Sequence, residues 1–423
     1  GVDFSMVAQA GVAKKLANMP PVGNMEDTPA ISVLRDREVK KLVQFIRTKC
    51  SRSGSLSKEP GNAVTRFFFL SQIDSRKQRS ESSHLPYDPL IPYAAGNDSC
   101  LHRELLKAGM DPSDSDQICK DLAQAASEAV QVVCEARSES NKTAVSFVDE
   151  VLQKESQNRQ MLICWKDDVM TINREHFLKA EKLYEKHTGS EDPKKQLFLL
   201  RLFCMLMRYE SIGGPGYQAA VPMSVFEILC KELDVEHECF ASPFNHTLPS
   251  FGSAFFDTDR FFGSRGSFFS ASDPALDLTT SALANTSSSS HIYRLLQGGS
   301  FQANPPFVEE SMQLMSETID AVLSYTHEHD PPLATSFVII VPAWTDERSH
   351  EMMKESRFCK RQIVLEKSQH SYKSGAQHSS LQQYHDAGFK TSVFFLQNRK
   401  GAEKWPVTDM RVRMIQKAFT EWK

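Results

Sequence analysis

The tetrapeptide Asn304-Pro305-Pro306-Phe307 is the stretch whose residue types could perform chemistry. An acceptor pair made of the Asn304 side-chain oxygen and the Pro305 carbonyl could hold both hydrogens of an exocyclic amine on a nucleobase. That geometry would turn the nitrogen lone pair out of the ring plane and towards an electrophilic methyl group. Pro305 and Pro306 fix φ and remove backbone donors, which directs the carbonyl into the site. The Phe307 ring could stack on the base, a contact worth roughly 1–3 kcal/mol.

The tetrapeptide lies where a short apolar stretch gives way to a helical pattern. Glu309 and Glu310 fall in the first helical turn, where the helix dipole favours acids. Apolar residues then recur at helical spacing: Val308, Met312, Met315, Ile319 and Val322. Open α/β sheets place their ligands at such a strand-to-helix edge. Taken alone, the same four residues are also typical of a proline turn that precedes a helix.

Size and composition narrow the class of protein. The chain has 423 residues, enough for two domains with substantial cores, and its 40% hydrophobic and 24% charged residues are typical of a soluble globular protein. The net charge of −4 argues against a generally basic coat for nucleic acid, so any RNA contact must be a local patch. The longest apolar run, Leu197 to Met207, is interrupted by Arg201 and too short to span a bilayer, so no membrane partner is expected.

Cysteine usage points to an intracellular protein without a metal site. The nine cysteines are scattered and odd in number, with no CxxC pair and no Cys/His cluster at zinc spacing. Such usage predicts reduced thiols in a reducing compartment.

The first half of the chain, residues 1–190, is expected to be a mainly helical domain. Residues 1–35 are small, polar and proline-containing, which is typical of a loosely held tail. Four helical patterns follow. The first covers Leu34 to Cys50, and the second begins at Asp114 and is expected to continue through Leu152 and Leu162. The third covers Arg174 to His187, and the fourth is the largely apolar Lys195 to Tyr209.

The second half, residues 191–423, has the alternation of strands and helices that indicates an α/β sheet. A short buried strand is expected within His237 to Asn245, and a serine-rich segment over about 270–298 is expected to be a mobile insertion. Three further strands are expected after the tetrapeptide: Phe337 to Val341, Gln362 to Leu365 and Ser392 to Leu396.

That order is compatible with a cofactor that carries adenosine, although no GxGxxG motif is present. In S-adenosylmethionine enzymes the first strand end holds the methionine part and an acid after the second strand binds the ribose hydroxyls. The residues that fit the first role by position are Ser242, Pro243 and Asn245. Those that fit the ribose and the adenine are Asp257 or Asp259, with Phe262 and Gly263. Each of these acids could instead cap a turn, and the last two residues could merely shape the bend.

Eight ordered sequence blocks extend from Arg208 to Trp405, about half of the chain. They are GYQAAVP, ECFASPFN, SAFFDTDRFFGSRG, GSFQANPPF, FVIIVPAW, SRFCKRQIVL, HSYKSGAQH and FFLQN. With these blocks the C-terminal half resembles the phosphorylated-CTD-interacting-factor family, the cap-specific adenosine N6-methyltransferases (CAPAM).

The resemblance implies a Rossmann-like, S-adenosylmethionine-dependent methyltransferase core with an N-terminal helical domain that helps to hold the capped end of RNA. It implies a nuclear enzyme that methylates N6 of the adenosine next to the cap, with Asn304, Pro305, Pro306 and Phe307 as its catalytic motif. Residues in the later blocks could contact the capped RNA, unless they only form a solvated strand edge: Lys360, Arg361, Tyr372, Lys373, Gln377 and His378.

One departure from the family concerns recruitment. The human-type member carries an N-terminal WW domain that binds the phosphorylated polymerase tail. Here the tryptophans are Trp165, Trp344, Trp405 and Trp422, and the first 160 residues contain no WW pattern. We therefore expect no WW domain and no WW-mediated binding to the polymerase tail.

The mechanism requires alignment more than acid–base chemistry, because the methyl group sits on a sulfonium and the reacting atoms need only be held about 3–3.5 Å apart. Two other functions remain open from the sequence. One is methylation of a different amine by the same core, such as a DNA or RNA adenine or a protein glutamine. The other is a catalytically inactive module that binds RNA.

Overall fold

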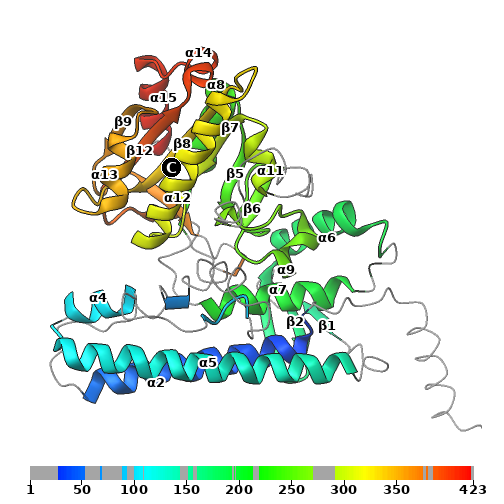
Figure 1. Ribbon diagram of the computed structural model, residues 1–423. Helices are drawn as coiled ribbons and strands as arrows, with labels where there is room; N and C mark the ends of the chain where they lie inside the picture. Colours follow the sequence, from blue (N-terminus) through cyan, green and yellow to red (C-terminus); the bar gives the residue numbers. More distant parts are fainter. Residues whose placement is uncertain are drawn as a thin grey trace, which may run out of the picture.

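The computed structural model describes residues 27–52, 67–68, 88–92, 100–107, 109–142, 151–155, 160–192, 195, 197–212, 219–269, 291–374, 378–379 and 384–420. A helix-covered sheet formed by the second half of the chain lies against the long helices of the first half (Figure 1). Within the described ranges, no helix is both long enough and apolar enough to cross a bilayer.

The second half is built around a six-stranded sheet in the order β6-β5-β7-β8-β12-β9. In that order the strands are Phe251–Ser253, Val235–Ala241, Gly299–Ala303, Thr335–Pro342, Thr391–Gln397 and Cys359–Leu365. The first four are parallel neighbours, whereas β12 runs antiparallel to both β8 and β9. The predicted α/β class is confirmed as a mixed sheet, and the strands predicted after the tetrapeptide are present.

Helices cover both faces of this sheet (Figure 1). Because successive residues of a strand point to opposite faces, β8 directs Phe337 and Ile339 into one core and Val338 and Ile340 into the other, all fully buried. The first core lies under α11, α12 and α13, and the second under α8 and α15. These helices are α8 (Met223–Leu233), α11 (His291–Leu296), α12 (Glu309–Glu328), α13 (Arg348–Glu355) and α15 (Asp409–Thr420).

The first half and the stretch that follows it up to Ile212 contain the helices that the periodicity predicts. Two long helices, α2 and α5, pack along each other, and α7 is buried on nearly every side, as its apolar sequence requires. The helices are α2 (Pro29–Arg52), α4 (Cys100–Lys107), α5 (Pro112–Lys142), α6 (Arg174–Thr188) and α7 (Phe198–Ile212).

One segment expected to be helical is a three-stranded antiparallel sheet, so that prediction is wrong. Its strands are β1 (Leu152–Glu155), β2 (Gln160–Trp165) and β3 (Asp168–Asn173). The loop between β2 and β3 consists of Lys166 and Asp167, and Lys166 has a positive φ of 52°. A tight turn between two stretches rich in branched apolar residues is the signal that the helical interpretation overlooked.

Shorter elements make up the rest of the secondary structure in the described ranges. A second small sheet has the order β11-β10-β4. Its strands are β4 (Ala219–Ala220), β10 (Ser371–Ser374) and β11 (Tyr384–Asp386), and the remaining short helices are α9 (Phe256–Asp259), η1 (Arg260–Phe262) and α14 (Arg399–Lys404).

The serine-rich insertion was expected to continue to about residue 298, and residues 270–290 of it lie outside the described ranges. Its last part is not a mobile insertion, because α11 begins at His291, and both His291 and Leu295 are fully buried. Leu295 packs against α12 in the core.

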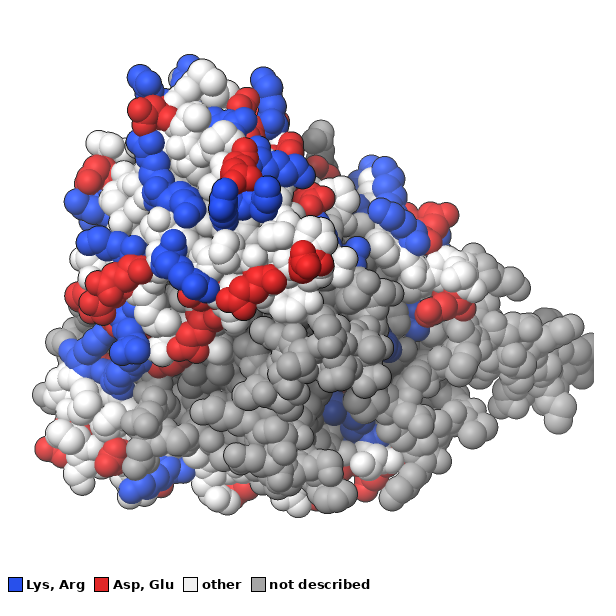
Figure 2. Space-filling model, turned by 45° about the horizontal axis from the view of Figure 1, so that its top comes forward, with Lys and Arg blue, Asp and Glu red and all other residues white. Residues whose placement is uncertain are grey.

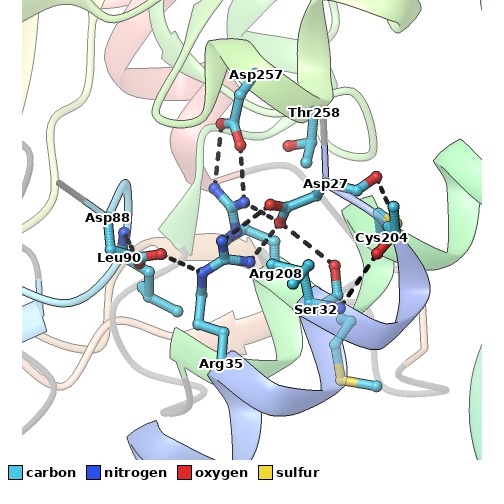
Figure 3. Close-up of polar contacts among 12 residues, drawn as sticks. Asp27, Ser32, Arg35, Asp88, Leu90, Cys204, Arg208, Asp257 and Thr258 are labelled. Carbon is cyan, nitrogen blue, oxygen red and sulfur yellow. Dashed lines mark hydrogen bonds and ion pairs between the residues drawn. The ribbon is translucent and has the colours of Figure 1, made fainter. Parts of the chain in front are cut away.

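A buried ionic cluster joins the two halves of the chain (Figure 3). Its members are three acids and three arginines: Asp27, Asp88, Asp257, Arg35, Arg137 and Arg208. Asp27 accepts hydrogen bonds from Arg35 and, at 2.6 Å, from Arg208. Arg208 also donates to both carboxylate oxygens of Asp257, at 3.1 and 2.8 Å. The tail expected up to residue 35 therefore ends earlier, since Asp27 and Arg35 are part of the core.

We expect Asp27→Asn to destabilise the fold strongly. The substitution keeps the size of the side chain but leaves the buried arginines in excess, and breaking a buried ion pair in this way costs about 3–5 kcal/mol. Urea unfolding measures the change, with Glu403→Gln as the control, because Glu403 pairs with Arg399 and Lys400 at the exposed end of α14.

The pH dependence of the stability gives a second test of the ionic cluster. Burial alone would raise the pKa of Asp27, but Arg35 and Arg208 hold it far below its ordinary value. The stabilisation is therefore present above the unfolded pKa and lost as the pH falls towards the folded one. A loss of less than about 0.5 kcal/mol for Asp27→Asn, no larger than an ordinary surface substitution, would contradict this role of the cluster.

Candidate active site

The main cleft lies at the carboxyl edge of the central sheet, where the strand order reverses. From β5 the chain passes to β6 on one side and then to β7 on the other, so the ends of β5 and β7 flank a topological switch point. Residues of α7, β5 and β7 and the turns that follow the strands line a cleft of about 840 Å³, open solvent included. In open α/β sheets, small ligands bind in such a crevice outside the carboxyl ends of the strands.

Asn304 stands directly after β7 in the lining of this cleft, together with Pro305 and Pro306. Its Nδ2 donates a 2.6 Å hydrogen bond to the carbonyl of Ala219. Because a carbonyl only accepts, this contact fixes the amide so that Oδ1 is the free end. Oδ1 is buried and has no partner among the described residues. The structure therefore leaves an oriented acceptor at the position that the sequence predicts for it.

The sequence prediction missed two polar side chains on the floor of the cleft. Glu238 of β5 and Gln302 of β7 are register partners, and both are almost completely buried. Glu238 accepts hydrogen bonds from the backbone N–H groups of Thr247 (2.6 Å) and Leu248, and burial raises its pKa to about 7. The Nε2 atom of Gln302 is buried without a partner among the described residues. An acid within the apolar block that precedes Ser242 was the signal available in the sequence.

The residues predicted to hold the methionine part are brought only partly to the cleft. Ser242 and Asn245 line it and bond each other reciprocally, with the Ser242 N–H donating to Asn245 Oδ1 at 2.7 Å and the Asn245 N–H donating to Ser242 Oγ at 3.2 Å. This closes the turn after β5. Pro243 is buried in the same turn and is absent from the lining of the cleft.

The residues predicted for ribose and adenine are absent from the lining of the cleft and have partners elsewhere. Asp257 is engaged by Arg208, and Asp259 is fully buried and accepts a 2.6 Å hydrogen bond from the hydroxyl of Tyr209. Phe262 is fully buried against Tyr184, with ring centroids 5.7 Å apart.

Gly263 shapes the bend after η1, where its φ of +97° favours glycine. A Cβ at this position would also lie 2.5 Å from the Nε2 atom of His187. These features give it a role in the backbone and none in lining the cleft.

Phe307 is also placed differently from the prediction. Its side chain is 6% exposed, and its ring packs edge-on against Tyr372 and Phe389, with centroids 6.0 and 5.6 Å away. Tyr372 is itself buried and bonds Thr391 at 2.9 Å. Stacking on a base needs an accessible ring face, so we assign Phe307 and Tyr372 to the packing that supports the tetrapeptide.

The predicted RNA contacts are dispersed. Lys360 and Arg361 lie near the start of β9. Arg361 pairs with Phe395 of β12, and Phe395 pairs in turn with Val338 near the start of β8. They are consequently at the opposite end of the sheet from the cleft, and Arg361 pairs with Asp409. Neither residue lines the cleft that contains Asn304.

The remaining predicted contacts lie in and after β10. Lys373 is half-buried, and burial lowers its pKa. His378 is 3% exposed and stacks on Phe244 at 4.3 Å, and burial lowers its pKa to about 4. Gln377 lies outside the described residues.

A second, polar cleft opens at the same edge of the sheet. It lies between α4 and the ends of β8 and of the tetrapeptide loop, and it encloses about 620 Å³, open solvent included. Its lining combines one tryptophan with acids and two basic residues: Trp344, Glu104, Glu309, Asp346, Glu347, Arg103 and Lys107. Ion pairs hold α4 across it, from Arg103 to Glu310 and from Lys107 to Glu347. Glu309 in this lining lies five residues after Asn304 of the main cleft.

Comparison with known proteins agrees with the sequence blocks. Residues 179–375 match the family model described as the phosphorylated CTD interacting factor 1 WW domain. Proteins from Mus musculus and Homo sapiens, each named mRNA (2'-O-methyladenosine-N(6)-)-methyltransferase, are 34% identical to this chain over 275 residues. The alignment covers 63% of this chain and 35% of each relative, so the chain spans about a third of the length of these relatives. The predicted resemblance to the phosphorylated-CTD-interacting-factor family is confirmed.

The same match corrects one expectation. We expected a chain without a WW domain, yet the family model named for that domain matches residues 179–375. In the structure this range extends from α6 to β10 and includes most of the central sheet.

The buried acid of the cleft gives a testable pH dependence. Glu238 has its pKa raised from 4.5 to about 7, so between these values the folded chain holds a proton that the unfolded chain has lost. Stability therefore falls as the pH rises through this window. Glu238→Gln keeps an acceptor for the two backbone N–H groups and removes the titration. We expect the variant to gain stability relative to wild type between about pH 5 and pH 8, by about 1.4 kcal/mol for each unit of displaced pKa.

Urea unfolding at both pH values provides the measurement. The exposed Glu227→Gln substitution on α8 serves as the matched control. If the difference between Glu238→Gln and wild type is the same at both pH values, the folded chain does not hold the extra proton.

Proposed function

We propose that this chain, whose residues 179–375 match the phosphorylated-CTD-interacting-factor family, is a nuclear S-adenosylmethionine-dependent methyltransferase with a Rossmann-like core. Its substrate is capped RNA, and the reaction transfers a methyl group to N6 of the adenosine next to the cap. The name of the two relatives specifies methyl transfer to N6 of a 2′-O-methyladenosine in mRNA, and we extend that reaction to this chain.

The observation that carries the proposal is the orientation of Asn304. Its amide is anchored through Nδ2 on Ala219, and Oδ1 is buried in the cleft without a partner among the described residues. A buried acceptor without a donor costs about 1–3 kcal/mol, so its presence favours a substrate that supplies the donor. An exocyclic amine meets this need, and the bond directs its lone pair away from the ring.

The neighbouring cleft lining suits the cofactor. S-adenosylmethionine carries an ammonium and a carboxylate at its amino-acid end, and Glu238 and Gln302 offer a carboxylate and an unpartnered amide N–H side by side. Ser242 and Asn245 close the turn above them. A Rossmann-like arrangement is supported by the location of the cleft at the switch point between β5 and β7.

The chemical step then depends on positioning. S-adenosylmethionine would supply a methyl group from its sulfonium, with the sulfur–carbon bond replaced by a nitrogen–carbon bond, and Asn304 would hold the amine nitrogen in line with that methyl group. The nitrogen becomes cationic and loses one of its protons to solvent, so no residue is assigned as a base. The contribution of this chain is to align the amine and to exclude competing orientations.

The second cleft is our candidate for the methylguanine of the cap. Methylated guanine is cationic, and Trp344 with the acids around it offers an aromatic ring and negative charge, the groups that attract such a cation. Arg103 and Lys107 of α4 could neutralise the cap phosphates. Lys and Arg side chains are interspersed with Asp and Glu on the face shown in Figure 2, so selectivity on that face cannot arise from a uniformly basic surface.

Removing the oriented acceptor should abolish most turnover. We expect Asn304→Ala to lower kcat on capped RNA by about 100–1000-fold, the usual loss for a hydrogen bond directed at the reacting group. Cofactor affinity, measured by calorimetric titration, should change little, because the cofactor contacts are assigned to other residues. A variant with near-normal kcat would contradict the role of Asn304, and a wild-type chain that binds the cofactor without turnover would identify an inactive RNA-binding module.

Removing the aromatic ring from the second cleft should reduce the preference for capped over uncapped RNA. Trp344→Ala removes the ring that faces the cationic base, and we expect it to raise KM for capped RNA about tenfold while kcat/KM on uncapped RNA stays near that of wild type. Lys400→Ala, on the exposed α14, is the control. Equal losses on both RNAs would show that Trp344 supports the fold and does not recognise the cap.

A further inference from the structure

Three buried side chains next to the main cleft converge on one point. His237 and Cys239 are two residues apart on β5, so they share the face that packs against α11 and α12, and His291 is the first residue of α11. Their ligand atoms all lie within 4.8 Å of one another, and the three side chains are at most 1% exposed. The Nε2 atoms of the two imidazoles are 3.2 Å apart.

The outer nitrogens of both rings are engaged by other groups. His291 Nδ1 lies 3.1 Å from the carbonyl of Gly266, and because a carbonyl only accepts, Nδ1 carries the proton and Nε2 has a bare lone pair. His237 Nδ1 lies 2.8 Å from Ser250 Oγ. Metal-binding histidines are usually held in this manner, with the outer nitrogen bonded to a carbonyl or hydroxyl and the inner nitrogen directed at the ion.

We propose that His237, Cys239 and His291 form a buried site for a thiophilic divalent ion of the Zn²⁺ class. Two imidazole nitrogens and one thiolate are ligands that zinc prefers over Mg²⁺ or Ca²⁺. Cys239 also lines the main cleft, from which solvent could supply the fourth ligand.

The same atoms also permit a metal-free, hydrogen-bonded arrangement. The test must distinguish this arrangement from metal binding. The hydroxyl of Ser250 could donate to His237 Nδ1, and His237 Nε2 could then donate to the lone pair of His291 Nε2. This relay satisfies both rings but makes no use of Cys239. Arg265 and Arg294 lie close enough to oppose further positive charge. Burial raises the pKa of the Cys239 thiol well above its ordinary value, so an ion must displace the thiol proton in order to bind.

A metal ion here would hold β5 to α11, two elements that are far apart in the sequence. The ion would sit behind the wall of the cleft that contains Phe268 and Phe269. We therefore assign it to stabilising the cleft, outside the methyl-transfer chemistry, and its existence does not depend on the proposed function. No zinc spacing is visible in the sequence, because His291 lies far from His237 and Cys239 along the chain.

The test uses the full chain, purified without a histidine tag. Elemental analysis should find about one equivalent of zinc per chain, and removal by a chelator should lower Tm and be reversed by adding Zn²⁺ alone. Cobalt added to the stripped chain should give a thiolate-to-metal charge-transfer band. Cys239→Ala should lose the metal and the chelator effect, whereas Cys230→Ser on α8 should keep both.

The cobalt spectrum is recorded on wild type, so the result does not depend on whether Cys239→Ala folds. A wild-type chain that binds neither zinc nor cobalt at micromolar concentration, with a Tm that the chelator leaves unchanged, would overturn the proposal. It would assign the three residues to the hydrogen-bonded relay.

Discussion

The arrangement of the two halves depends on the ion pairs of the buried Arg208 guanidinium. This guanidinium comes from α7, a helix that packs with the first half, and it binds Asp27 before α2 and Asp257 in α9. A fully buried cation requires such partners, because removing it from water costs several kcal/mol that only opposite charges and hydrogen bonds offset. The chain around it is thereby drawn together from three distant parts of the sequence.

The burial of Arg208 also determines which side chains are available to line the main cleft. Tyr209, the neighbour of Arg208, lines the cleft and donates to the buried Asp259, where burial raises the pKa of the acid to about 6. The two acids after β6 are therefore committed to holding α7 against the sheet. Two buried polar groups of the cleft, Glu238 and Gln302, come instead from β5 and β7, the strands that flank the switch point.

The sequence predicted local elements well and tertiary partners poorly. The edge at Asn304, the strands after it and the helices of the first half follow from periodicity and turn chemistry, which are local properties. Asp257 resembled a ribose ligand because its partner Arg208 is 49 residues away and cannot be recognised by spacing. Phe307 looked like a stacking platform because burial against Tyr372 and Phe389 depends on long-range packing. The helical prediction around Leu162 failed because apolar residues at mixed spacing fit a helix and a hairpin about equally.

The most direct test of the account is identification of the methylated atom. The chain is incubated with methyl-labelled S-adenosylmethionine and an equimolar mixture of capped and uncapped RNAs that begin with adenosine or guanosine, and the products are digested and analysed by mass spectrometry. The account predicts label only on N6 of the first adenosine of capped RNA. Label on internal adenosines, on uncapped RNA or on protein amides would contradict the assigned substrate, and absence of label with bound cofactor would contradict the assigned reaction.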